Sequence, residues 1–154
     1  DSTVEGTISV SGSTISYNGF SGTHETSGVP DNTDVGTVCS TIDELDTYAT
    51  GTDKADKTRA DHAKIKVSDT EGDKRVYGVL QRYDDNGKPL VASVGIGSIK
   101  VTGSCEGGDL LESNGDGTAK VQSDDIIRSK TIGKVTIGNS GTGVKLVSCV
   151  LYCG

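Results

Sequence analysis

The sequence has few residues from which to build a large core. It contains no methionine, no tryptophan and one phenylalanine, and Ile, Leu, Val and Phe together make up 34 of its 154 residues. That share lies close to the level of roughly 20% below which a chain buries too little apolar surface to fold. We therefore expect a single domain with a small core.

Long apolar runs are also missing. A membrane-spanning helix needs about 18 consecutive apolar residues, and a signal peptide places a basic segment before an apolar one. The sequence has neither pattern. We therefore expect no membrane insertion.

Positive charge is in deficit, with 15 Lys and Arg against 22 Asp and Glu and a formal net charge of -7. A protein that binds nucleic-acid phosphates independently of base sequence needs a net positive surface charge. We therefore expect no nucleic-acid partner. Glycine-rich phosphate loops, dinucleotide fingerprints, zinc-binding helices and nucleophile elbows are absent as well. No cofactor is expected.

The chain begins at Asp1 without an initiator methionine, which indicates a piece of a longer protein. Residues 144–154 form a strand-like run that stops at Gly154, and we expect this end to be the C-terminus of the parent. Residues 1–154 are accordingly interpreted as one C-terminal domain.

Glycine, serine and threonine are abundant, with 22 Gly, 17 Ser and 18 Thr. Short β-branched segments alternate with Gly, Asn and Asp, which is typical of strands joined by tight turns. The strongest turn is Asn86-Gly87, because a two-residue hairpin turn needs positive φ angles. The predicted hairpins pair residues 7–10 with 14–17, 76–83 with 90–94, 110–112 with 119–122, and 131–137 with 144–152.

Two segments depart from this pattern. The spacing from Thr41 to Glu44 matches a capping box and predicts one or two helical turns. Residues 49–62 are polar and poor in apolar side chains, so they are predicted to form an exposed loop. The predicted fold class is an all-β, hairpin-rich sandwich or barrel-like domain with at most one short helix.

Segments such as 64–68 and 99–102 alternate polar with apolar residues, so each strand should have one solvated face. Chains with so thin a core gain stability by associating with copies of themselves. We therefore expect an oligomer.

Four cysteines are present, at positions 39, 105, 149 and 153. Cys149 and Cys153 would lie about 13 Å apart on one face of a strand, so they cannot bridge each other. Pairing of either with Cys39 or Cys105 stays open, although four small buried thiols are the favoured interpretation. A zinc site would need a closer pair and a nearby histidine, so no metal is expected.

Candidate catalytic residues are few. His24 follows Ser21 and Thr23 and is a candidate general base for a hydroxyl nucleophile, whereas His62 lies in the predicted loop. Acidic residues gather at 84–85, 114–117 and 124–125. The middle group lacks the regular oxygen ligands and the closing Glu of an EF-hand calcium loop, and turn chemistry explains it without a metal. Glycoside hydrolysis by paired carboxylates stays open, although the chain has few aromatic residues to stack on a sugar.

Three stretches carry a family resemblance. The first is residues 17–24, containing Phe20-Ser21-Gly22-Thr23-His24; the second is residues 66–79; the third runs from Gly108-Asp109-Leu110-Leu111 through Ser129-Lys130-Thr131-Ile132-Gly133 to Gly154. Together they cover most of the chain after Ile15, and their order and spacing make the set specific. They resemble the C-terminal domains of tailed-bacteriophage tail fibre, tailspike and neck-appendage proteins.

The resemblance implies a virion protein assembled in the host bacterial cytoplasm. Related domains act as intramolecular chaperones: they form a homotrimer and bring three chains into register, so that the fibrous part upstream can wind. In many cases they release themselves by cleavage between a Ser and an Asp. Asp1 fits the new N-terminus of such a cut, and His24 is the candidate base, which would make the chain a single-turnover autoprotease without an external substrate.

Two other functions stay open. One is a receptor-binding tip that remains on the mature fibre and contacts a host cell-surface receptor through its loops. The other is a hydrolytic module acting on host polysaccharide. Whether the domain remains in mature virions distinguishes a chaperone from a tip.

Overall fold

The computed structural model describes residues 10–11, 14–15, 21–48, 53–55 and 57–153, and within them the fold is all-β without a helix. This confirms the predicted class. The strands are β1 (Val10–Ser11), β2 (Thr14–Ile15), β3 (Ser21–Glu25), β4 (Val38–Thr47), β5 (Thr58–Val67), β6 (Val76–Tyr83), β7 (Pro89–Val101), β8 (Leu110–Ser113), β9 (Ala119–Val121), β10 (Gly133–Val135) and β11 (Lys145–Tyr152).

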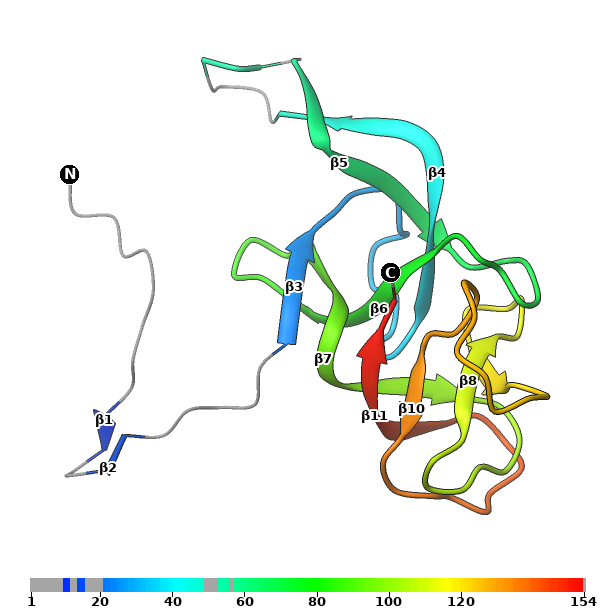
Figure 1. Ribbon diagram of the computed structural model, residues 1–154. Helices are drawn as coiled ribbons and strands as arrows, with labels where there is room; N and C mark the ends of the chain where they lie inside the picture. Colours follow the sequence, from blue (N-terminus) through cyan, green and yellow to red (C-terminus); the bar gives the residue numbers. More distant parts are fainter. Residues whose placement is uncertain (1–9, 12–13, 16–20, 49–52, 56, 154) are drawn as a thin grey trace.

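Five strands close into a barrel (Figure 1). Going round it, β11 pairs with β10, β10 with β8, and β8 with β9, all antiparallel. The ring is completed where β9 meets β7 in a parallel contact at Ala119 and Val101, and where β7 pairs with β11 along eight residues. A closed ring leaves these strands no long open edge on which another chain could add.

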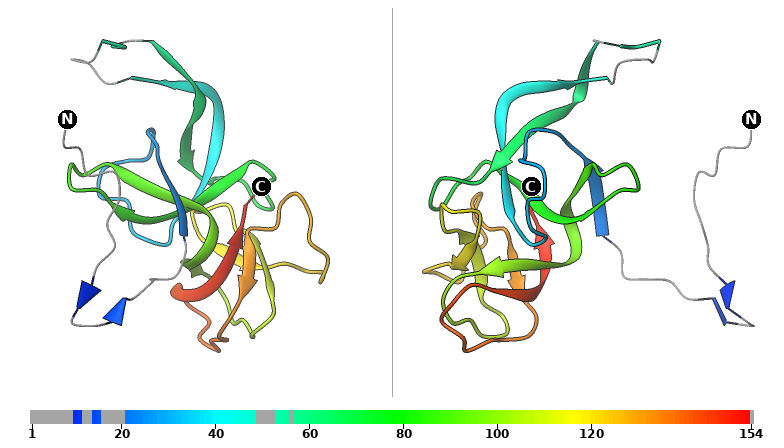
Figure 2. Two further views of the ribbon diagram at one scale, coloured as in Figure 1. Left: turned by 60° about the vertical axis from the view of Figure 1, so that its left-hand side comes forward. Right: turned by 180° about the vertical axis from the view of Figure 1, so that it is seen from behind.

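β7 extends beyond the barrel and organises a second set of strands. Its first half pairs with β6 and with β3, and β6 pairs in turn with β4, which pairs with β5. β4 and β5 form a long two-stranded ribbon whose outer part projects away from the barrel in every view (Figures 1 and 2).

The buried side chains are small and aliphatic. The larger cluster fills the barrel and includes Ile99, Leu111, Ile132 and Leu151, while a second cluster of Cys39, Ile65, Leu80 and Val91 lies beneath the base of the ribbon. No aromatic residue is among the buried hydrophobic residues of the described chain. The prediction of a small core is therefore confirmed.

The predicted hairpins are confirmed where the structure describes them. β1 and β2 pair with each other, and the remaining three pairs are β6 with β7, β8 with β9, and β10 with β11. Gly87 takes a φ of +77° in the β6–β7 turn, as the Asn-Gly signal predicts. The outer ends of the first hairpin, residues 7–9 and 16–17, lie outside the described residues.

The predicted helical turns after Thr41 are wrong, because β4 continues through this segment as a strand. Thr41 pairs with Ile65 across the ribbon, and the guanidinium of Arg75 donates to both carboxylate oxygens of Asp43, at 2.7 and 3.1 Å. A capping box satisfies only the first backbone donors of a helix. Pairing with β5 on either side of the segment, at Thr41 and again at Leu45, instead continues the chain as a strand.

The exposed loop predicted for residues 49–62 is wrong from Thr58 onward, where β5 begins. Thr58 pairs with Thr47 of β4. The apolar alternation that would have revealed a strand is missing because both faces of the outer ribbon are largely solvated. Long polar side chains cover it instead: the Arg59 guanidinium lies 5.4 Å from the ring centre of Tyr48.

Candidate functional site

The outer surface of the barrel carries an apolar face on β7 and β11. We call it the β7–β11 face and define it by Val94, Ile96, Leu146, Val150 and Tyr152. Val94, Ile96 and Leu146 are 47%, 53% and 54% exposed. Exposed apolar side chains that gather on one surface, rather than lying scattered singly, mark a candidate interaction site.

Strand register explains why these side chains share a face. Val94 lies opposite Tyr152, and Ile96 lies opposite Val150. Alternate residues of a strand point to opposite sides, so Leu146 points the same way, beyond the pair formed by Ser98 and Ser148. The intervening side chains of β7 and β11, among them Ile99 and Leu151, fill the barrel.

Glycine is the reason that apolar side chains point outward here. Gly95 and Gly97 occupy the inward positions beside Val94 and Ile96. A Cβ on Gly97 would lie 2.8 Å from the Leu151 side chain, so Leu151 fills the space that a β7 side chain would normally take. At this part of β7 the core is completed from β11, and Val94 and Ile96 face outward.

An ion pair borders the face next to Leu146. Lys100 lies opposite Leu146 in the strand register, and its ammonium group lies 2.5 Å from the carboxylate of Asp34. The hydrogen bond from Lys100 holds the pKa of Asp34 below its usual value. The aspartate therefore stays ionised, and the polar border of the face stays charged, well below neutral pH.

A cleft of about 560 Å³ adjoins the other end of the face. Tyr152 lines it together with Leu110, Lys134 and Ile127. Burial is the main cause that raises the pKa of Tyr152, so its hydroxyl stays protonated and able to donate a hydrogen bond at neutral pH.

Of the two candidate self-cleavage residues, the structure describes His24. His24 lies on β3 opposite Val91, with its side chain exposed and its ring centre 6.2 Å from that of Tyr77. Among the described residues no serine or threonine hydroxyl is hydrogen-bonded to the His24 ring. Asp1 lies outside the described residues, so its relation to His24 stays a prediction.

His62 lies in β5 rather than in a loop. Its Nε2 accepts a hydrogen bond from an Arg59 Nη2 at 2.8 Å, and its Nδ1 lies 3.2 Å from a carboxylate oxygen of Asp61. Because an arginine only donates hydrogen bonds, Nε2 must be the acceptor nitrogen of a neutral His62 ring. The ring proton is then on Nδ1. His62 therefore fixes the position of Arg59.

All four thiols are free, which agrees with the favoured interpretation of unpaired cysteines. Cys39, Cys105 and Cys149 are buried, whereas Cys153 is half-buried. Burial raises the pKa of Cys39, Cys149 and Cys153 to about 12. These three thiols are therefore protonated, poor nucleophiles at neutral pH.

The acidic clusters serve turns and ion pairs. An Asp84 oxygen accepts from the backbone amides of Asn86 and Lys88, and an Asp116 oxygen accepts from the amide and hydroxyl of Thr118. Asp124 accepts from the Arg128 guanidinium at 2.8 Å. No group of three or more potential metal ligands occurs among the described residues.

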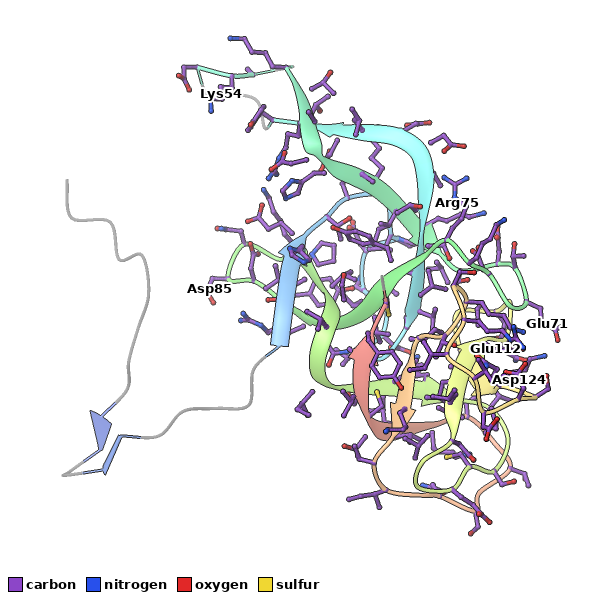
Figure 3. The ribbon with its side chains drawn as sticks, in the orientation of Figure 1. Lys54, Glu71, Arg75, Asp85, Glu112 and Asp124 are labelled. Carbon is purple, nitrogen blue, oxygen red and sulfur yellow. The ribbon has the colours of Figure 1, made fainter. Side chains whose placement is uncertain are left out.

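A nearly buried carboxylate ties the β8–β9 hairpin to neighbouring loops. The side chain of Glu112 is 8% exposed and lies between the ammonium groups of Lys120, at 3.8 Å, and Lys130. Lys120 also pairs with Glu71, and Figure 3 shows Glu71 and Glu112 on the same side of the molecule. Because every charge in this group has an opposite neighbour, it acts as a structural clamp.

An oligomer is expected from the small core, but the sequence alone does not identify the surface that would form it. The signal was present at Val94-Gly95-Ile96-Gly97, where apolar residues alternate with glycine instead of with polar residues. Strand alternation normally places apolar residues on the buried side. The outward direction of Val94 and Ile96 becomes clear only from the structure, in which Leu151 fills the space on the inner side of β7.

None of the described residues forms a helix that is long and apolar enough to cross a membrane. No protein-family model and no curated protein matches the chain.

Proposed function

We propose that this chain is an assembly domain of a bacteriophage fibre or appendage, which forms a homotrimer through the β7–β11 face. The observation that carries the proposal is the outward placement of Val94, Ile96 and Leu146, each close to half exposed. Covering apolar surface of this kind on association contributes about 25 cal/mol for each Å² removed from water.

The small core gives a second reason for self-association. The buried hydrophobic residues are dominated by Val, Ala, Ile, Leu and Cys, so each copy has little large side-chain volume with which to stabilise itself. A trimer adds buried surface without enlarging the individual core. The phage-fibre setting rests on the resemblance of residues 17–24, 66–79 and 108–154.

The proposed role is to set the register of the fibrous part upstream. Long β structure with repeated patterning has a weakly specified register, and non-local strand pairing is slow. A trimeric domain holds three chains at a high effective concentration. Winding then starts from aligned chains.

Oligomeric state tests this proposal directly. Light scattering during size-exclusion chromatography of residues 1–154 should give three times the 15.8 kDa chain mass. Ile96→Lys should shift the mass toward the monomer, because it places a charge in the contact. Ile126→Lys is the matched control, since Ile126 is 57% exposed against 53% for Ile96 and lies outside the face. A monomeric wild-type chain contradicts the proposal, as does equal trimer formation by both variants.

Self-release is the second part of the proposal. Hydrolysis of the peptide bond before Asp1, with His24 as the base, would free the domain after assembly. Intact-mass analysis of the complete parent protein should show a fragment beginning at Asp1. This fragment should be missing from the His24→Ala variant and from a variant in which the residue before Asp1 is replaced by Ala. Uncut wild-type protein contradicts self-release and favours a trimeric tip that stays attached.

A further inference from the structure

One arginine of the β4–β5 ribbon contacts two acceptors in different parts of the fold. Nη2 of Arg59 lies 2.8 Å from Nε2 of His62, and Nη1 lies 3.9 Å from a carboxylate oxygen of Glu25. The first contact is a hydrogen bond, whereas the second is an ion pair longer than a hydrogen bond. While His62 is neutral, Arg59 is therefore bonded to His62 rather than to Glu25.

The choice of acceptor decides what Arg59 connects. His62 lies with Arg59 on β5, and Tyr48, whose ring centre is 5.4 Å from the guanidinium, follows β4. Figure 3 locates this outer part of the ribbon by Lys54. Glu25 instead ends β3, which pairs with β7. A bond to His62 stays within the ribbon, whereas a bond to Glu25 joins the ribbon to β3.

A backbone contact keeps Glu25 within reach of the ribbon. The carbonyl of Ser27 accepts from the amide of Ile65 at 3.0 Å. Gly28 has a φ of +108°, and a Cβ there would lie 2.1 Å from the Ile65 carbonyl oxygen. The segment that follows β3 is therefore held against β5, so Glu25 stays close to Arg59 whichever acceptor the arginine uses.

The second ring nitrogen of His62 already has its own partner. Nδ1 lies 3.2 Å from a carboxylate oxygen of Asp61, and the hydrogen bond from His62 is the main cause that lowers the pKa of Asp61. Asp61 therefore stays ionised and accepts from Nδ1 whether or not the ring is charged. A proton added to His62 must go to Nε2, the atom that accepts from Arg59.

Protonation of His62 places two donors face to face. A charged imidazole donates from both nitrogens, and a guanidinium never accepts, so the hydrogen bond between Nε2 and Arg59 is lost. The side chains of His62 and Arg59 are 20% and 21% exposed. Solvent therefore screens the repulsion between the two charges only in part. Histidine is the side chain whose charge ordinarily changes between pH 5 and pH 8.

The surrounding charges direct Arg59 towards Glu25. A movement of about 1 Å would shorten the 3.9 Å separation to that of a charge-assisted hydrogen bond. Asp46 of β4 and Lys88 of the β6–β7 turn line the same cleft, and Lys88 lies 3.7 Å from the same Glu25 oxygen. Since a carboxylate accepts several hydrogen bonds on its two oxygens, Glu25 can hold Arg59 and Lys88 together.

We propose that His62 and Arg59 form a pH-controlled latch, in which protonation of His62 transfers the Arg59 hydrogen bond to Glu25 and ties the β4–β5 ribbon to β3. At higher pH, Arg59 returns to His62 and its hydrogen bond stays within the ribbon. The latch does not rest on the proposed trimer, because none of these residues belongs to the β7–β11 face. Ile96→Lys should therefore titrate as the wild type does.

Nuclear magnetic resonance of the ¹³C,¹⁵N-labelled chain between pH 8 and pH 5.5 tests the latch. The chain has two histidines, so the ring signals of His62 and His24 can be followed separately. We expect the Glu25 carboxyl carbon and the Tyr48 ring to shift with the same midpoint as the His62 ring. The range stops at pH 5.5 because carboxylates ordinarily protonate near about pH 4.

His62→Gln is the matched variant. The side-chain oxygen of glutamine accepts from Arg59 at every pH and does not titrate. The shifts of Glu25 and Tyr48 between pH 8 and pH 5.5 should therefore be lost. His24 remains in this variant, so any shift that persists would come from a group other than His62.

Three outcomes would overturn the proposal: a Glu25 signal that does not follow the His62 ring, a Glu25 signal that follows His24 instead, or equal Glu25 shifts in His62→Gln and the wild type. Movement of Tyr48 without Glu25 would show that Arg59 turns to solvent and would also exclude the latch. If His62→Gln perturbs the fold, the wild-type titration still decides, because it compares the midpoints of two side chains in one intact protein.

Discussion

At the scale of single residues, the buried thiols couple stability to alkaline pH. The pKa of Cys39, Cys149 and Cys153 is raised to about 12 in the folded chain, against about 8.5 in an unfolded chain. A raised pKa gives stability that is complete below the unfolded value and is lost as the pH rises through the folded value.

We therefore predict that the urea midpoint falls between pH 8.5 and pH 12, where the unfolded thiols ionise first. Iodoacetamide at pH 8 should label these three cysteines slowly in the native chain and rapidly in urea, with mass spectrometry as the readout. Equal labelling rates in the two states would show that the thiols are accessible.

Close packing at one glycine should be equally testable. A Cβ on Gly133 would lie 2.4 Å from the Val150 carbonyl oxygen, whereas a Cβ on Gly143 would meet nothing within 4 Å. We predict that Gly133→Ala lowers the free energy of unfolding by about 1–3 kcal/mol or more, because backbone must move.

Gly143→Ala is the control for this substitution and should change the free energy of unfolding by less than about 0.5 kcal/mol. Urea denaturation followed by circular dichroism measures both. If the two variants had similar urea midpoints, β10 and β11 would be able to move apart without loss of folding stability.

At the scale of elements, a side chain completes the edge of β7. The amide nitrogen of Gln81 donates to the Ser98 carbonyl at 3.0 Å, and its oxygen accepts from the Ser98 amide at 3.2 Å. Gln81 thus takes the place of a paired strand where β7 passes from one group of strands to the other.

Gln81→Ala leaves both Ser98 groups without these partners, and we predict a loss of about 1–3 kcal/mol in the free energy of unfolding. Hydrogen exchange at the Ser98 amide should accelerate more than at neighbouring amides. Arg82→Ala, on the exposed side of β6, is the control. Unchanged exchange at Ser98 would show that water replaces the Gln81 amide without loss.

Element prediction from the sequence succeeded where turn chemistry was strong and failed where tertiary contacts decided. Asn86-Gly87 correctly places the β6–β7 hairpin, because the required backbone conformation is local. Thr41 to Glu44 meets a local rule for helices, yet pairing with Ile65 and the Asp43–Arg75 contact keep it in a strand. Neither partner is visible from the local sequence.

At the scale of the whole molecule, surface ion pairs link stability to acid. Hydrogen bonds from Lys100, Arg75, Lys66 and Arg128 lower the pKa of Asp34, Asp43, Asp69 and Asp124, respectively. A lowered pKa gives stability that is present above the unfolded value, about 3.9, and is lost as the pH falls through the folded value.

We predict that the urea concentration at the unfolding midpoint decreases when the pH is lowered from 5 to 2. High salt should reduce this decrease. The effect of each pair is small because these carboxylates are exposed and screened by solvent. Chemical denaturation at several pH values, with and without added salt, measures it. A midpoint that rises on acidification would contradict the assigned direction.

The all-β class and a small core could be predicted from the sequence, since composition and turn residues determine them. The β7–β11 face could not, because its direction depends on how Leu151 fills the space beside Gly97. The ion pairs of Glu25 with Arg59 and Lys88 could not be predicted either. These residues are far apart in the sequence and meet only through the β3–β7 and β4–β5 pairings.

The order in which the barrel strands occur along the chain sets the time at which folding can finish. β7, β8, β9 and β10 all precede β11, which pairs with both β7 and β10. During synthesis the ring stays open until β11 has left the ribosome. A chain that ends before β11 therefore cannot close its barrel and cannot present the full β7–β11 face.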